Sequence, residues 1–372
     1  MIVEDLNGLT VRLLERPDAH TVGAVLRVWS GAVDDPPGRD GTAHLLEHLN
    51  VAATARDLTR SGLSPLRGTT GNTATAYTGV CLPEDTPALA GALAAALQRP
   101  DPDERTLESE RNAVIVEMRA AAVRPLARLG PVIADAACPG RGLAAGLAAD
   151  EHSVNEIGPP DLAGLWAGRY LPPYQAEIAI AGPALDRDRL LSGFARSPGT
   201  ERRAATPAAA GAPGSGLPLA PELDGVTAVS LVRRRGDAGM VAALTGRRGA
   251  LTALAAGHGR PLRGRSTVTG IGCRVEVLCW DAGSDLAAAL ARDLDRLTGT
   301  ALGAVARESR AAAQTSAFRS HTPLGAAVSA IAEDPSLDIS MPQRLTVWTV
   351  ADRVPRRIAE HTVPSPEEGD SC

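Results

Sequence analysis

The chain is poor in aromatic residues and has no lysine. Phenylalanine, tryptophan and tyrosine make up only 2% of its 372 residues, whereas 44% of the residues are hydrophobic. Its packed cores must therefore consist mainly of alanine, leucine and valine. All 38 basic residues are arginines, which we attribute to the coding bias of a GC-rich genome rather than to function.

The sequence also lacks a cluster of positive charge. The net charge is −5 and no basic stripe is present. Because phosphate contacts need clustered positive charge, we expect no nucleic-acid partner. No apolar stretch approaches the length of a membrane span, so we expect no membrane partner. Residues 1–5 are acidic and do not have the basic-then-apolar plan of a secretory signal, which predicts a cytoplasmic protein.

The cysteines form no disulfide framework that the sequence can identify. Their number is odd and no two of them make a C-x-x-C pair. Unpaired thiols in a reducing compartment are the simplest interpretation. The five are Cys81, Cys138, Cys273, Cys279 and Cys372.

The most informative feature present is the run His44-Leu45-Leu46-Glu47-His48, near the start of a helix predicted over residues 43–59. Two histidines four residues apart project from one face of a helix, at a spacing that can hold one Zn²⁺. Glu47 lies on an adjacent face, where it can take a proton from a water molecule. This H-x-x-E-H order is the signature of the inverted zinc peptidases.

A catalytic zinc site needs a third protein ligand, usually a carboxylate. Residues 104–122 have the pattern of an amphipathic helix, in which Glu110 and Glu117 are two turns apart and share a face. Glu117 follows an apolar run at 113–116, and we predict that it points inward among its apolar neighbours. The alternative is a solvated helix with ordinary surface carboxylates.

Five separated segments resemble the pitrilysin/insulinase family of zinc metallopeptidases, in its bacterial processing-protease branch. They occur in the family's order over roughly residues 5–195. The segments are residues 7–11, the loop 34–41 before the zinc motif, and residues 82–85, 110–114 and 170–176.

The resemblance implies an activity and a set of site residues. His44, His48 and Glu117 would be ligands of one Zn²⁺ per chain, Glu47 the general base, and Glu110 a residue that orients a ligand. The implied function is a zinc-dependent endopeptidase that hydrolyses short or unfolded peptides. A narrower expectation from the same analogy is the trimming of a leader peptide.

The order of predicted elements indicates an α+β fold with helices layered on a sheet. Residues 1–196 form the expected zinc-binding catalytic domain, and residues 197–222, rich in Pro, Ala and Gly, the expected linker. Residues 223–372 are expected to form a shorter second domain with a loose C-terminal tail. The resemblance implies two domains of the pitrilysin/insulinase (mitochondrial-processing-peptidase-like) type, the second shortened.

Individual elements can also be predicted from hydrophobic periodicity and turn residues. Strands are predicted at residues 10–14, 22–29, 73–81, 177–181, 226–232 and 267–280. Helices are predicted at residues 43–59, 87–98, 104–122, 125–137, 160–170, 285–297 and 301–318.

The chain departs from the family in the residues that the second half contributes to the active site. Active members place an Arg and a Tyr from the second half across from the zinc, but Tyr77, Tyr170 and Tyr174 all precede the linker. We therefore expect a homologous partner subunit that supplies the pair in a heterodimer. The alternative is that this chain is a non-catalytic or weakly active subunit that shapes a chamber and binds peptide. A structural zinc site is a third possibility, although such sites usually have four protein ligands.

A second departure concerns the family's edge strand beside the zinc, which commonly carries an Asn-Ala-x-Thr run and pairs with extended substrate. The matching stretch here is Arg67-Gly68-Thr69-Thr70. We predict substrate contacts from Thr69, Thr70, Gly71 and Asn72, and we expect Tyr77 to be a packing residue.

Overall fold

The computed structural model describes most of the first half of the chain and parts of the second, which divide into two compact units. Unit 1 comprises Met1–Met118, Ala148–Ala209 and Ser316–Ala332, and unit 2 comprises Arg119–Leu147, Ala210–Thr315 and Glu333–Cys372. The described residues are 1–6, 8–170, 176–194, 219–233, 250–270, 273–281, 284–293, 322–330, 344–351 and 353–362.

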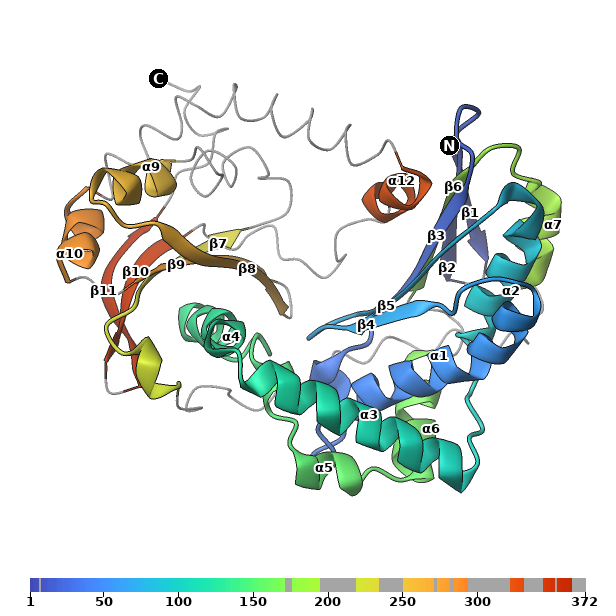
Figure 1. Cartoon of the computed structure of the whole chain (residues 1–372), viewed down its shortest axis with the longest axis horizontal. Helices are drawn as coiled ribbons and strands as arrows, with labels where there is room; N and C mark the ends of the chain where they lie inside the picture. The colour runs from blue at the N-terminus through green and yellow to red at the C-terminus, as the bar shows by residue number, and fades with distance from the viewer. Residues whose placement is uncertain are drawn as a thin grey trace. The chain divides into compact units, whose positions relative to one another are not determined.

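Unit 1 is built on a six-stranded mixed sheet (Figure 1). Strands β2 and β6 are parallel and every other neighbouring pair is antiparallel. All seven residues of β6 are buried, as expected for a central strand that is covered on both faces. In sheet order the strands are β1 (Ile2–Leu6), β2 (Leu9–Glu15), β6 (Ala176–Gly182), β3 (Val22–Val28), β5 (Thr75–Cys81) and β4 (Arg67–Thr70).

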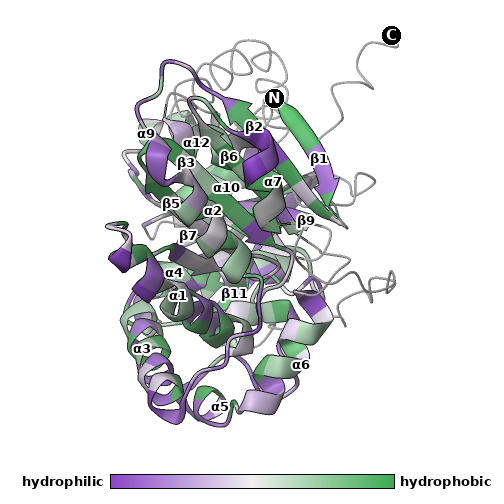
Figure 2. Cartoon of the chain, turned by 90° about the vertical axis from the view of Figure 1, so that its right-hand side faces the viewer, coloured by the Kyte–Doolittle hydropathy of each residue, from purple (hydrophilic) through white to green (hydrophobic). Residues whose placement is uncertain are grey.

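One face of this sheet carries the larger core of unit 1, which is made mainly of leucine, valine and alanine side chains. The helices that contribute to this core are α1 (Thr42–Arg60), α2 (Thr86–Ala95), α3 (Glu104–Ala122), α5 (Glu151–Asn155), α6 (Pro159–Arg169) and α7 (Arg187–Phe194). Helix α3 alternates hydrophilic and hydrophobic residues along its length (Figure 2), the amphipathic character that its sequence predicts.

The opposite face of the sheet is covered by α12 (Pro323–Ala330), which packs against β3 and β6 (Figure 1). Ala326 and Ala327 lie against alanine and valine side chains of these strands. The helix approaches so closely that a Cβ atom at Gly23 would lie 2.1 Å from the main-chain nitrogen of Leu324. Small residues on both sides therefore set the distance between helix and sheet.

Unit 2 contains a five-stranded antiparallel sheet. Helix α4 (Pro125–Ala137) packs on one face of it, and α9 (Ala250–Gly257) and α10 (Ser284–Arg292) pack on the other. In sheet order the strands are β11 (Val354–Thr362), β10 (Arg344–Ala351), β7 (Thr227–Arg233), β9 (Cys273–Trp280) and β8 (Leu262–Gly270). Short 3-10 helices lie at Ala32–Asp34, Pro83–Asp85, Ala145–Leu147 and Pro221–Leu223.

The two units exchange one helix across the expected linker. Helix α4 precedes residues 197–222 in the sequence yet belongs to unit 2, and α12 follows them yet belongs to unit 1. Most of the expected linker, residues 197–218, lies outside the described residues. Each unit therefore combines sequence from both sides of the expected linker.

The α+β fold is as predicted, and most predicted elements of the first half are found. Helices α3 and α4 have the bounds that the sequence predicts. The single strand predicted at residues 267–280 is wrong, because the chain reverses after Gly270 and forms two antiparallel strands, β8 and β9. The helix predicted at residues 301–318 and the tail after Val363 lie outside the described residues.

Strands β1, β10 and β11 were not predicted from the sequence. In the part of the chain that the structure describes, no helix has the length and apolar character that crossing a bilayer requires.

Candidate metal centre

Helix α1 starts at a point fixed by the loop before it. Gly41 precedes the helix with a φ of 99°, a backbone conformation that favours glycine. The half-buried carboxylate of Asp35 accepts hydrogen bonds from the main-chain N–H groups of Gly41 and Ala43, both at 2.7 Å. These are donors that a helix N-terminus leaves without partners within the helix. The first turn, which contains His44, is therefore held in place.

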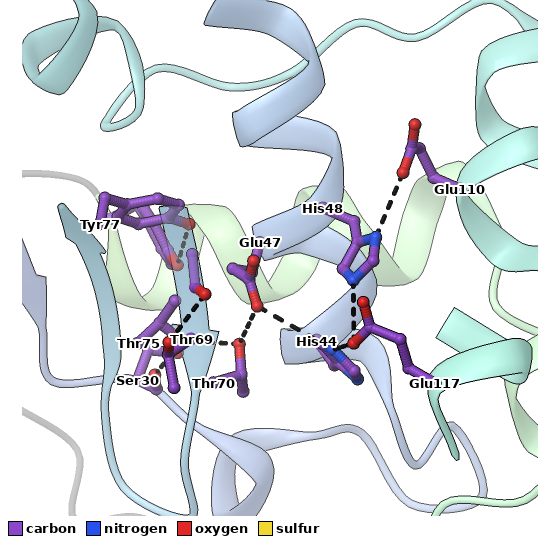
Figure 3. Close-up of polar contacts among 12 residues, drawn as sticks. Ser30, His44, Glu47, His48, Thr69, Thr70, Thr75, Tyr77, Glu110 and Glu117 are labelled. Carbon is purple, nitrogen blue, oxygen red and sulfur yellow. Dashed lines mark hydrogen bonds and ion pairs between the residues drawn. The ribbon is translucent and has the colours of Figure 1, made fainter. Parts of the chain in front are cut away.

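The two histidines of the motif meet Glu117 from α3 (Figure 3). Glu117 Oε2 lies 3.4 Å from His44 Nε2 and 3.7 Å from His48 Nε2. The predicted inward orientation of Glu117 is wrong, since its side chain is 61% exposed. Ile115 is on the buried face of α3, and Glu117, two residues later, lies about 200° further round the helix.

Glu110 contacts His48 at Nδ1, the ring nitrogen that does not face Glu117. The distance between His48 Nδ1 and Glu110 Oε2 is 3.2 Å. Because an ionised carboxylate can only accept, Nδ1–H is the donor; in the neutral form of His48 that metal binding requires, this leaves the lone pair of Nε2 directed toward Glu117. A carboxylate partner of this kind fixes the tautomer and ring orientation of a metal-binding histidine.

Glu47 lies on the other side of the histidines and is buried. Its Oε2 is 4.0 Å from His44 Nε2 and accepts a hydrogen bond from Thr70 Oγ1 at 3.1 Å. Burial raises the pKa of Glu47, although the charge of His48 and the bond from Thr70 oppose the rise. Burial also lowers the pKa of His44, with the charge of His48 acting in the same direction. A lowered pKa favours the neutral imidazole that metal binding requires.

These distances fit a bound metal ion. In a tetrahedral site with bonds of about 2.0–2.1 Å, neighbouring donor atoms are about 3.4 Å apart. The distances from Glu117 to the two Nε2 atoms are close to this value. Glu47 Oε2 is further from His44 Nε2, at 4.0 Å, and it already accepts a hydrogen bond from Thr70. Among the described residues, His44, Glu47 and His48 form a group that could hold a metal ion, with possible ligand atoms all within 4.8 Å of one another.

The predicted substrate residues lie on strand β4 and the turn that follows it. Gly71 N–H donates to the carbonyl of Ala74. Bonded and non-bonded pairs alternate along an antiparallel ladder, so the main-chain groups of Thr69 point to β5 and those of Gly68 and Thr70 point to the free edge. The carbonyls of Gly71 and Asn72 accept bonds from Ala32 N–H and Val33 N–H. Gly68, which the sequence reasoning missed, is therefore on the free edge together with Thr70.

The buried hydroxyls of Tyr77 and Tyr170 form a hydrogen-bonded pair that contacts α1 through Asn50. Asn50 Nδ2 donates to the hydroxyl of Tyr77 at 3.0 Å, and the hydroxyls of Tyr77 and Tyr170 are 3.1 Å apart. Burial raises the pKa of Tyr170 to about 12 and that of Tyr77 as well. Tyr77 packs in the core, as expected, but its contact with Asn50 could not be read from the sequence.

Part of the chain is similar in sequence to known proteins. Residues 10–150 match the family model described as insulinase (peptidase family M16). Protease 3 of Escherichia coli strain K12 is 33% identical over 137 residues, which cover 35% of this chain and 14% of that protein. Protease 3 of Shigella flexneri matches with the same values. The chain thus covers only a small part of the length of these curated relatives.

Solved structures share the fold over most of the chain. A protease from Helicobacter pylori matches with a TM-score of 0.64 and 14% identity, over 88% of this chain and 86% of that one. A peptidase M16 inactive domain from Pseudomonas fluorescens matches with a TM-score of 0.58 and 14% identity, over 82% and 84% of the two chains. The same fold therefore occurs in a protein named as a protease and in one named as inactive.

Proposed function

Residues 10–150 place this chain in the insulinase/pitrilysin family, and from that premise we propose that it is a zinc-dependent endopeptidase acting on short or unfolded peptides. The observation that supports this most directly is the intact catalytic set. Glu117 Oε2 lies 3.4 Å and 3.7 Å from the Nε2 atoms of His44 and His48, and Glu47 lies beside His44 with a hydrogen bond from Thr70.

In this proposal each residue has a distinct role. His44, His48 and Glu117 hold the zinc ion, which when bound polarises the scissile carbonyl and makes water acidic near neutral pH. Glu110 fixes the ring of His48 through the bond at Nδ1. Glu47 accepts the proton of the attacking water and returns it to the leaving amine.

Strand β4 supplies a place for the peptide. It is one of the two edge strands of the sheet and lies directly beside Glu47. The outward main-chain groups of Gly68 and Thr70 can pair with an extended peptide by strand addition, a mode in which main-chain hydrogen bonds bind many different sequences. This suits an enzyme for unfolded substrates.

The test compares the full chain with its Glu47→Gln variant. Both should contain about one zinc ion per chain, because Glu47 is not a ligand. Only the unaltered chain should cleave a mixed pool of unstructured peptides. Absence of stoichiometric zinc, or cleavage that survives in Glu47→Gln, would contradict the proposal.

We further propose that the active form is a heterodimer in the cytoplasm, with a homologous partner subunit that supplies the Arg-Tyr pair. All three tyrosines of the chain lie at or before residue 174, so its second half has no Tyr to offer. Loss of one oxyanion donor costs roughly a hundredfold or more in rate. A zinc-loaded chain that cleaves poorly alone should therefore gain activity when the partner is added. Leader-peptide trimming is the narrower task we propose for this complex.

The second candidate function is a non-catalytic, chamber-forming and peptide-binding subunit. Its support is the missing tyrosine and the inactive domain among the similar structures. It predicts that Glu47→Gln changes nothing, alone or with the partner, whereas the peptidase proposal predicts loss of cleavage in both settings.

A further inference from the structure

The carboxylate of Glu47 lies directly on the backbone of strand β4. A Cβ atom added at Gly68 would be 1.8 Å from Glu47 Oε1, 2.4 Å from Cδ and 2.7 Å from Cγ. The Glu47 side chain is only 7% exposed, so it has little room to move aside. A side chain at position 68 therefore requires the Glu47 carboxylate to shift from its observed position.

Thr70, two residues further along β4, holds the same carboxylate. Its hydroxyl donates to Glu47 Oε2 at 3.1 Å (Figure 3). Thr75, buried on β5, has its hydroxyl 3.4 Å from that of Thr70 and donates its single proton to the carbonyl of Ser30 at 2.8 Å. Because the Thr75 proton is already used, the Thr70 proton remains available to Glu47.

Residues 68 and 70 also share a direction. Alternate residues of a strand point to the same face, so the Cα of Gly68 and the side chain of Thr70 both face α1, and their main-chain groups both face the free edge. The surface that supports Glu47 and the edge that can pair with a peptide are thus formed by the same two residues.

We propose that Gly68 and Thr70 are positioning residues for Glu47 and that they couple peptide binding to the orientation of this carboxylate. The catalytic part of this inference rests on the proposed peptidase function. An edge strand is paired on one side only, and a peptide that pairs with the other side adds hydrogen bonds at these two residues. Binding of the peptide therefore immobilises the backbone on which Glu47 lies.

The contact itself can be tested without enzyme activity, by a double-mutant cycle on thermal unfolding of the full chain. Gly68→Ala should lower the melting temperature by several degrees, because the methyl group displaces the carboxylate. In a Glu47→Ala background the same change should cost little. Gly71→Ala is the matched control in the same hairpin, since its added Cβ meets nothing closer than 3.4 Å. An equal loss with and without Glu47 would overturn the proposal.

The catalytic consequence is tested with the zinc-loaded full chain, and with its partner subunit if cleavage requires it. Gly68→Ala and Thr70→Val should lower kcat roughly tenfold or more, with KM within about threefold of the unaltered value and zinc content unchanged. Thr70→Ser keeps the hydroxyl and should restore kcat. Unaltered kcat in Thr70→Val, or loss of zinc in either variant, would overturn the positioning role.

If the unaltered chain cleaves nothing, the proposed function fails, whereas the unfolding cycle still decides whether Gly68 supports Glu47.

Discussion

Glu110 and Glu108 lie on the same helix but meet different partners. Glu110 accepts from His48 Nδ1, whereas Glu108 is exposed and pairs with Arg111. Removing a carboxylate that orients a metal-binding histidine typically weakens metal binding about 10–100-fold. We therefore expect Glu110→Ala to lower zinc affinity by that factor, measured by competition with a chromogenic chelator. Glu108→Ala should bind zinc as the unaltered chain does. Equal affinities in all three proteins would contradict the role of Glu110.

Tyr77 provides a second prediction at this scale. In Tyr77→Phe the amide of Asn50 loses its hydroxyl partner, and the hydroxyl of Tyr170 loses one of its hydrogen-bond partners. A buried polar group left without a partner costs about 1–3 kcal/mol, so the free energy of unfolding should fall by that amount in a denaturant titration. Adding Asn50→Ala should cost less than in the unaltered chain, because the interaction is already lost. Strictly additive effects would show that the two side chains do not interact.

The residues of the metal centre differ in how far the sequence predicts them. His44, Glu47 and His48 lie within one turn and a half of helix, so their arrangement follows from helical spacing alone. Glu110 and Glu117 were identified through the family resemblance, and the inward orientation of Glu117 was wrong. The contact between Gly68 and Glu47 depends on the register of β4 against β5 and on the packing of α1. Nothing in the local sequence encodes it.

Helix α1, which carries the zinc motif, depends on the half-buried carboxyl of Asp35 in the loop before it. Burial raises the pKa of Asp35 from its ordinary value of 3.8 to about 7, even though its bonds with Ala43 and Gly41 lower it. The folded protein therefore binds this proton more tightly than the unfolded chain does. The stability that this group contributes is complete below pH 3.8 and is lost as the pH rises through about 7.

We accordingly expect the free energy of unfolding to fall between pH 5 and pH 8 by more in the unaltered chain than in Asp35→Asn, which cannot titrate. Thermal or denaturant unfolding across this range measures the difference. Asp35→Asn should also be less stable at the low end of the range, since its amide nitrogen cannot accept from an N–H of the first turn. Parallel pH curves for the two proteins would contradict the raised pKa.

Among the elements, those with strong local signals were predicted best. Helix α3 follows a turn rich in proline and aspartate, and Asp103 accepts from Thr106 N–H at its start. Strands β10 and β11 lack such boundaries, and both depend on pairing with strands far away in the sequence or with each other. Strand identity of this kind is set by tertiary contacts more than by propensity.

At the scale of the whole molecule, α12 and the candidate metal centre belong to the same unit although they lie far apart in the sequence. We therefore expect the packing of α12 to affect the stability of the metal centre. Ala327 is fully buried against the sheet, whereas the next residue, Val328, is 42% exposed. A charge at the buried position cannot be paired and should cost about 3–5 kcal/mol. We expect Ala327→Asp to release zinc at a lower denaturant concentration than the unaltered chain. Val328→Asp, the matched control, should leave zinc release unchanged.

The exchange of α4 and α12 also has a consequence for how the protein is made. The ribosome delivers the strands of the first sheet by residue 182, but the helix that covers their second face is not synthesised until residue 330. For about 150 residues of synthesis, α12 is not yet present to cover the alanine- and valine-lined face of the sheet. Exposed apolar surface on a nascent chain invites aggregation. The apolar face of unit 1 is therefore covered by α12 only late in synthesis.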